Sequence, residues 1–211
     1  MRVTLSLILL TPLLAQVDLF DQIAVVVDKS IIKDSDVRRD ICLTQFLDNE
    51  PLRIDPAEKT KAAPRLIDQI LLREEIRIGG YSEATEQAVH SAIASLENTR
   101  FQSEAALEAA LKTYDLDEAE LRDQLRWQLT VLQFIDSRFK SAAIVQESAV
   151  DAYYREHLSA LKKNSPKAPE EELRLQARNI LEGEEVNRLL DSWLQQRRKE
   201  AKITFLEGGL K

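Results

Sequence analysis

The chain has 211 residues, of which 44% are hydrophobic and 31% are charged, a composition typical of globular rather than disordered proteins. The formal net charge is −7 and no lysine/arginine block is long enough to follow a phosphate backbone, so the sequence predicts no nucleic-acid binding. His90 and His157 stand apart from Cys42, the only cysteine, which indicates neither a metal site nor an internal disulfide.

The first fifteen residues form a separate segment. Met1 and Arg2 give a short basic start, and residues 3–15 (VTLSLILLTPLLA) are apolar and end in the small Ala15. A bilayer-spanning helix needs about 20 apolar residues, so this pattern predicts a cleaved secretory signal peptide rather than stable membrane insertion. The alternative is a buried N-terminal helix or strand. If the segment is a signal peptide, the protein works outside the cytoplasm.

Residues 21–37 (DQIAVVVDKSIIKDSDV) have a different character from the rest of the chain. The run from Ile23 to Val27 favours a strand, residues 28–30 can turn, and Ile31-Ile32 resume the strand pattern. A hairpin alone is marginally stable, so it needs a partner. The strand-like pieces that remain are 141–145 and 202–206, and the simplest sheet pairs the hairpin with the second.

Most of the chain between these strands has a helical pattern. Helices are expected over about 35–48, from a start or kink at Pro64 to residue 78, over 82–98 and 103–114, and over 117–140. The 64–78 helix is apolar on two sides, which predicts burial between partners. The 117–140 helix has one stripe expected to pack on 64–78, formed by Leu121, Leu125, Leu129, Leu132, Ile135 and Phe139. Its second stripe, formed by Trp127, Val131 and Phe134, needs another partner.

Two helices are expected near the C-terminus, one from residue 148 and one over about 170–200, joined by the linker 164–169 (NSPKAP). The last helix changes its apolar side near Gly183. Its first half has one apolar face, and its second half, which includes Trp193, has the opposite one. Such a helix either kinks or passes between two packing partners.

The order of these elements resembles the N-terminal domain of the SurA-type periplasmic chaperones, related to the PpiD and PrsA foldases. The resemblance rests on the strand IAVVVD, the helices containing LIDQILLREEI and LRDQLRWQL, the entry SAAIVQESAVDAYYREH, and the closing AKITFLEGG. It implies a mainly α fold, a helical bundle with a small sheet made by the N-terminal hairpin and the C-terminal strand. The expected organisation is a signal peptide (1–15), a chaperone core (16–140), and C-terminal helices with a closing strand that returns to the core (141–211).

Members of this family usually carry a parvulin-type prolyl isomerase domain before the closing segment. Too few residues separate Val145 from Ala201 for such a domain, and they have the pattern of two helices and a linker. Asn179 stands where the parvulin opening motif carries histidine. No Ser/His/Asp arrangement or glycine-rich phosphate loop is supported either. The sequence therefore predicts no enzyme, no catalytic residue and no cofactor.

With no enzyme predicted, the remaining class of function is protein binding. The resemblance implies an ATP-independent periplasmic chaperone whose partners are unfolded or extended segments of envelope and outer-membrane proteins. Six large side chains on the later helices are candidates for client contact. The favoured interpretation is that they fill the junction between the 117–140 helix and the C-terminal helices, and the alternative is that some of them line an exposed apolar cradle for client segments. The alternative function is an envelope adaptor that uses the same apolar groove for a single partner. The six candidates are Trp127, Val131, Phe134, Tyr153, Tyr154 and Trp193.

Overall fold

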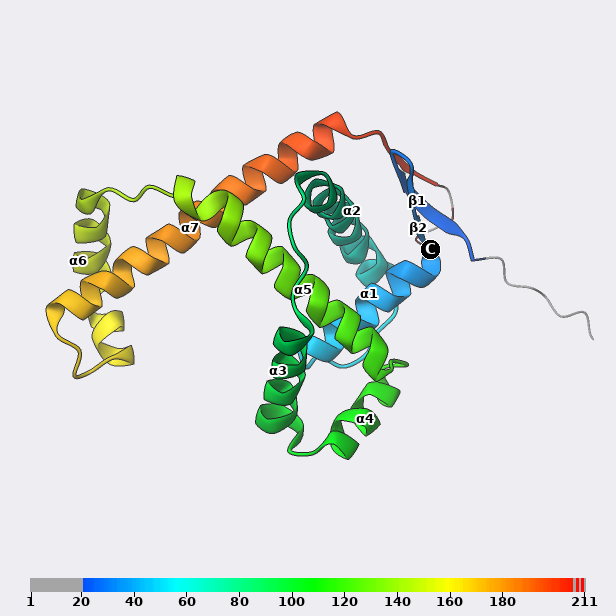
Figure 1. Cartoon of the computed structure of the whole chain (residues 1–211), viewed down its shortest axis with the longest axis horizontal. Helices are drawn as coiled ribbons and strands as arrows, with labels where there is room; N and C mark the ends of the chain where they lie inside the picture. The colour runs from blue at the N-terminus through cyan, green and yellow to red at the C-terminus, as the bar shows by residue number, and fades with distance from the viewer. Residues whose placement is uncertain (1–20, 207, 209, 211) are drawn as a thin grey trace, which may run out of the picture.

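The structure is a computed structural model that describes residues 21–206, 208 and 210 (Figure 1). The predicted signal peptide lies outside the described residues. Seven α-helices and three strands make up most of the described part. In chain order the elements are β1 (Ile23–Val27), β2 (Ser30–Lys33), α1 (Asp34–Leu47), α2 (Pro56–Gly79), α3 (Glu86–Leu96), a π-helix (Glu97–Phe101), α4 (Glu104–Thr113), α5 (Glu118–Phe139), a 3₁₀ turn (Lys140–Ala142), α6 (Glu147–Asn164), α7 (Glu170–Glu200) and β3 (Ile203–Phe205).

The predicted sheet is confirmed. Its three antiparallel strands lie in the order β2-β1-β3, and Val27 of β1 pairs with Ile203 of β3. Hydrogen bonds extend this pairing beyond the strands: the Asp28 N–H donates to the Lys202 carbonyl at 2.9 Å, and the Leu206 N–H donates to the Ala24 carbonyl at 3.0 Å. Figure 1 shows the chain after α7 running back to the hairpin, where β3 lies beside β1. The closing strand therefore returns to the start of the described chain.

Helix α2 lies at the centre of the packing, as its two apolar sides predicted. Ile67 and Leu71 pack beneath the sheet, whereas Leu72 and Ile76 pack with α5 and α7 on another side. Of the start or kink expected at Pro64, the start is wrong, because the helix begins at Pro56 and continues through Pro64. The earlier start has a local cause: the Asp55 side chain accepts hydrogen bonds from the backbone of residues 57 and 58, which caps the helix.

The leucine stripe of α5 packs with α2 as expected only at its C-terminal end, where Ile135 and Phe139 share a cluster with Leu72 and Ile76. Leu121 is fully buried against α1, α3 and α4, with Leu125 and Leu129 packed on the same cluster. Leu132 of this stripe is 61% exposed. The second stripe, which contains Trp127 and Phe134, packs with α2 and α7 in the cluster that contains Leu72 and Ile76. The helix pattern identified both faces correctly but could not assign the neighbours, because the α3–α4 hairpin covers the leucine side.

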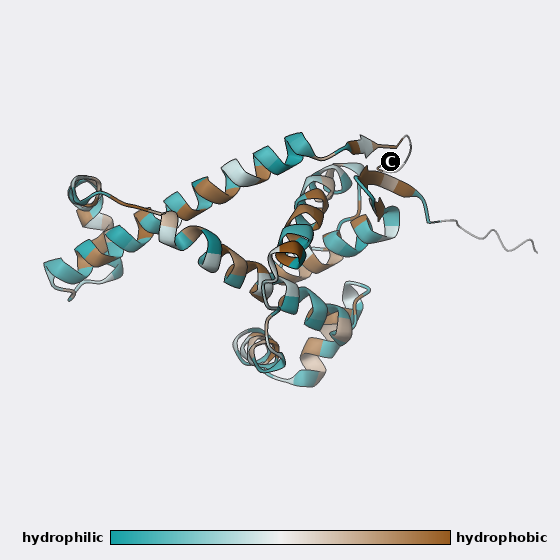
Figure 2. Cartoon of the chain, turned by 45° about the horizontal axis from the view of Figure 1, so that its top comes forward, coloured by the Kyte–Doolittle hydropathy of each residue, from teal (hydrophilic) through white to brown (hydrophobic). Residues whose placement is uncertain are grey.

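Helices α6 and α7 form an arm. The first half of α7 packs on α6 around a small core that contains Leu173 and Ala177, and the second half packs on α2 and α5 through Val186, Leu189 and Trp193. The predicted change of side is therefore confirmed, and the helix runs unbroken past Gly183. Figure 1 shows the arm projecting from the rest of the molecule, and Figure 2 shows hydrophobic patches alternating with hydrophilic ones along α7.

The predicted strand-like segment 141–145 is not part of the sheet. Residues 140–142 form a 3₁₀ turn, and Ala143 to Gln146 continue as an irregular connection to α6. The sheet takes only the C-terminal candidate because the α5–α6 connection lies at the arm, far from β1 in Figure 1. Two helices joined by a turn occupy residues 147–200, as expected.

Candidate functional site

Three helices, α2, α5 and α7, meet in a cluster of aromatic and aliphatic side chains that we call the aromatic junction. The Phe134 ring is 1% exposed and lies at its centre. The ring centroids of Tyr81, Phe139 and Trp193 lie 4.9, 5.9 and 5.9 Å from that of Phe134, at tilted or edge-to-face angles that aromatic pairs prefer. The junction is formed by buried Leu72, Ile76, Trp127, Phe134 and Phe139, with partly buried Tyr81, Val131, Ile135, Val186, Leu189, Leu190, Trp193 and Leu194 around them.

The six candidate residues fall into two separate places. Trp127, Val131, Phe134 and Trp193 come together in the aromatic junction, where they pack between α2, α5 and α7. The two tyrosines lie in the core of the arm instead: Tyr154 is buried, and Tyr153 stacks on His157 with 4.0 Å between ring centroids. The six residues therefore do not form one continuous surface.

The six candidate side chains differ in how much of their surface is accessible to a ligand. Phe134 and Tyr154 are 1% and 9% exposed, so their main role in this conformation is packing. Val131, Tyr153 and Trp193 keep part of their surface in solvent. Trp127 is 8% exposed, yet its ring lines a hollow in the surface. Client contact at these positions remains a prediction.

The hollow beside the aromatic junction has a volume of about 500 Å³, within the range of ordinary ligand pockets. We call it the junction hollow. Its apolar surfaces come from Trp127, Tyr81 and Ile76, and the Arg73 guanidinium carbon lies 4.0 Å from the centroid of the Trp127 ring. The complete lining is Arg73, Ile76, Arg77, Tyr81, Glu83, Asp123, Arg126, Trp127 and Thr130. An arrangement of aromatic rings beside arginine faces can hold an apolar or aromatic side chain.

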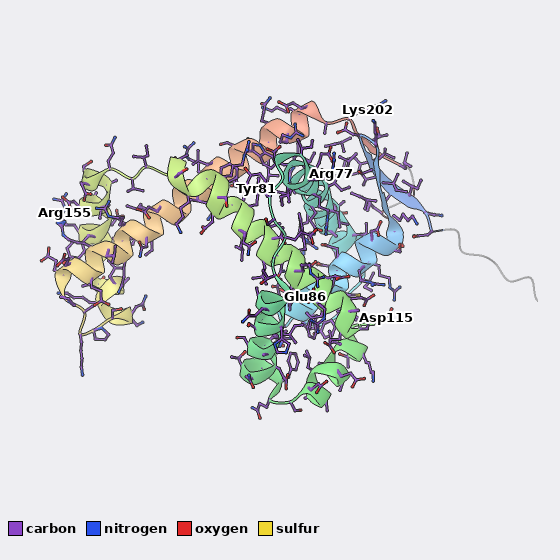
Figure 3. All side chains as sticks on the ribbon, in the orientation of Figure 1. Arg77, Tyr81, Glu86, Asp115, Arg155 and Lys202 are labelled. Atoms are coloured by element: carbon purple, nitrogen blue, oxygen red, sulfur yellow. The ribbon has the colours of Figure 1, made fainter. Side chains whose placement is uncertain are left out.

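Two glycines place Tyr81 at this hollow. Gly80 ends α2 with a φ of +66°, a left-handed conformation that turns the chain back at little cost for glycine. The Tyr81 ring then lies so close to Gly79 that any Cβ there would collide with it. Figure 3 shows Tyr81 and Arg77 at this end of α2, with Arg155 far away on the arm.

Tyr81 and Arg73 are not among the residues that the sequence predicted as candidates. The Gly-Gly-Tyr sequence at the end of α2 is a signal that could have identified Tyr81, since it places an aromatic ring directly after a helix stop. No comparable signal exists for Arg73, because its position over Trp127 depends on how α2 and α5 pack.

A partly buried ion pair joins α1 to α2, in which Asp40 is buried and Arg65 is partly exposed. The Arg65 side chain donates to Asp40 Oδ2, with 2.5 Å from Nη2, and the Gln69 amide donates to Asp40 Oδ1 at 3.2 Å. Burial raises the pKa of Asp40, because desolvation outweighs the effect of the Arg65 charge. We interpret this group as a structural connection between the two helices.

Among residues 21–206, no group of three or more histidine, cysteine, aspartate or glutamate side chains is arranged to hold a metal ion. No helix in the described part of the chain is long and apolar enough to cross a membrane.

The helical body, closed by a sheet that joins the two ends of the described chain and extended by a two-helix arm, is the fold of SurA-like chaperones. One match is to a solved structure from Campylobacter jejuni, from work on the virulence factor PEB4 and the periplasmic protein Cj1289, two structurally related SurA-like chaperones. It has a TM-score of 0.55 and 14% sequence identity, and it covers 89% of this chain and 100% of the solved chain. No protein-family model and no curated protein sequence matches the chain.

Proposed function

We propose that this protein is an ATP-independent periplasmic chaperone that binds unfolded or extended segments of envelope and outer-membrane proteins. The observation that carries the proposal is the fold likeness to a SurA-like chaperone over 89% of the chain. A chaperone of this kind needs only to bind the unfolded state, since binding lowers the concentration of free unfolded chains and so slows their aggregation. Export through a signal peptide at residues 1–15 is part of the proposal.

The junction hollow is the proposed contact for client side chains. Its rings and arginine faces suit apolar and aromatic groups, and its open position on the surface allows rapid exchange. The Phe134 ring packs edge-to-face against Tyr81, which is one wall of the hollow, and this contact supports a preformed surface for clients.

Light scattering from an outer-membrane protein diluted out of urea tests the proposal directly. We expect a several-fold excess of the chain from residue 16 onward to suppress aggregation, and an inert globular protein at equal concentration to leave it unchanged. Aggregation that proceeds at the same rate with and without the chain would refute the chaperone function.

A pair of variants tests the hollow itself. Arg73→Glu adds a carboxylate to a hollow that already contains Glu83 and Asp123, which makes it less favourable for apolar side chains. Arg155→Glu makes the same charge change on the exposed surface of the arm. Weaker suppression by the first variant alone is the expected result, and equal suppression by both would exclude the hollow as the contact.

We also propose that the protein lacks prolyl isomerase activity, since helices occupy residues 147–200 where the family's isomerase domain would be inserted. A tetrapeptide isomerisation assay should give the uncatalysed rate. Pull-down from an envelope extract separates the chaperone from the adaptor: many unfolded β-rich proteins support the chaperone, and one stoichiometric partner supports the adaptor.

A further inference from the structure

The Arg73 side chain covers part of the aromatic surface of the junction hollow. Its guanidinium carbon lies over the Trp127 ring, 4.0 Å from the ring centroid, and Trp127 keeps only 8% of its surface in solvent. Both side chains line the hollow. While the guanidinium stays in this place, that face of the indole is closed to any other ligand.

Weak interactions hold the guanidinium on the ring. Arg73 forms no hydrogen bond and no ion pair with any of the described residues, and the carboxylates of Glu83 and Asp123 attract it only through space. The residue is also exposed, so its side chain can turn into water without a backbone movement. A cation–π contact at an exposed site changes an equilibrium constant by only about two- to fivefold.

A second hollow offers a displaced guanidinium another place beside carboxylates. Arg73 lines this hollow as well as the junction hollow; it lies between α1, α2 and α5, has a volume of about 300 Å³, and is also lined by Asp36 and Asp40. Asp36 accepts a backbone hydrogen bond from Lys33 and forms no ion pair with any residue of the described chain. Arg73 therefore stands at the boundary between two hollows, with carboxylates on both sides.

We propose that Arg73 is a lid over the Trp127 ring: it stacks on the ring when the junction hollow is empty, and an apolar side chain of a client displaces it. This inference rests on the proposed chaperone function and adds an internal competitor to the same site. Each client must break the stack before it reaches the ring. Arg73 therefore lowers the affinity for clients and favours their release.

Acrylamide quenching of tryptophan fluorescence measures whether the ring is covered. The chain has two tryptophans, so Trp193→Phe leaves Trp127 as the only emitter and keeps a ring in the aromatic junction. Acrylamide is neutral, so a change of charge at Arg73 does not attract or repel it. In the whole chain with Trp193→Phe, Arg73→Ala should raise the quenching constant. The matched control is Arg155→Ala on the exposed surface of the arm, which should leave it unchanged (Figure 3).

Binding of N-phenyl-1-naphthylamine, a neutral aromatic dye, measures the competition itself. Its affinity for the whole chain, titrated by dye fluorescence in the same background, should rise about two- to fivefold in Arg73→Ala. Arg155→Ala should leave it unchanged. Arg73→Lys should give an intermediate affinity, since an ammonium group lacks the planar face of a guanidinium and is more strongly hydrated.

Unchanged quenching in Arg73→Ala, a dye affinity that stays equal or falls in this variant, or no dye binding at all would overturn the proposal. If light scattering still shows suppression of aggregation in any of these cases, the lid is wrong and the chaperone function stands. If suppression is absent as well, the chaperone function also fails. With the lid in place as proposed, Arg73→Ala suppresses aggregation at a lower concentration than the unmodified chain. Arg73→Glu has the opposite effect, because it adds a third carboxylate to the junction hollow.

Discussion

Removing residues 201–211 tests whether the closing strand holds the whole fold together. The truncation deletes β3 and leaves β1 with only β2 beside it. It removes the hydrogen bonds from Asp28 N–H to the Lys202 carbonyl, from Leu206 N–H to the Ala24 carbonyl, and from Lys202 N–H to Asp28 Oδ1 at 2.8 Å. Since the sheet packs on the core that contains Ile67 and Leu71, we expect the truncation to destabilise the whole fold rather than only the C-terminal end.

The size of this destabilisation follows from the hydrogen bonds and the apolar burial that β3 provides. The three hydrogen bonds that flank the β1–β3 ladder contribute ~3 kcal/mol at about 1 kcal/mol each, and the partly buried Ile203 adds ~1 kcal/mol. The ladder itself is lost as well, so the free energy of unfolding should fall by at least about 4 kcal/mol, a large part of the roughly 5–15 kcal/mol typical of a domain. With a urea m-value of about 2 kcal/mol/M, the unfolding midpoint should fall by roughly 2 M.

Urea titrations followed by circular dichroism, with the same N-terminal boundary in both chains, measure this difference. The matched control is Phe205→Ser, a change within β3 at a side chain that is 57% exposed, which should move the midpoint much less. Coincident curves for the full and truncated chains would refute the idea that β3 stabilises the core.

Three further predictions concern single residues. Burial raises the folded-state pKa of Asp40 above the ordinary value of 3.8, so the ionisation of Asp40 costs stability as pH rises from about 3.8 through the folded pKa. Urea titrations should therefore show that the stability of the unmodified chain relative to Asp40→Asn falls from pH 4 to pH 7. A rise over this range would show that the Arg65 charge dominates. Gly183→Ala should raise the free energy of unfolding by about 0.5–1 kcal/mol, since a Cβ there meets no atom within 4 Å and glycine is a poor helix former; a lower melting temperature would contradict this. Gly79→Ala should lower the free energy of unfolding by about 1–3 kcal/mol through collision with Tyr81, and an unchanged melting temperature would show that the ring moves aside freely.

The fold could be predicted from the sequence where a residue pattern identifies a strand or helix and also shows that it must pair or pack with another element. The apolar run Ile23–Val27 and the C-terminal strand each required a neighbour, and pairing them was the simplest solution. The opposite apolar faces of α7 likewise predicted two packing partners, because a straight helix cannot bury both sides against one surface.

The sequence did not predict which helices pack against each face of a given helix. The α5 pattern shows that Leu121 and Trp127 lie on different faces. Only the tertiary structure shows that Leu121 packs against the α3–α4 hairpin and Trp127 packs against α2. Size and aromatic character alone place Tyr153 and Tyr154 in one group with Trp193, yet the two tyrosines lie on α6 and pack in the core of the arm. The shape of the junction hollow arises from such packing, so residue type alone could not locate it.

The closing sheet also constrains when the protein can finish folding. Asp28 and Lys202 are in hydrogen-bond contact although 174 positions separate them along the chain. Helices and the β1–β2 hairpin can form from local contacts, but the other edge of β1 must wait for β3, and contacts this distant in sequence are slow to form. Until β3 pairs, that edge of β1 is exposed, so the folding protein itself passes through a state vulnerable to strand-mediated aggregation.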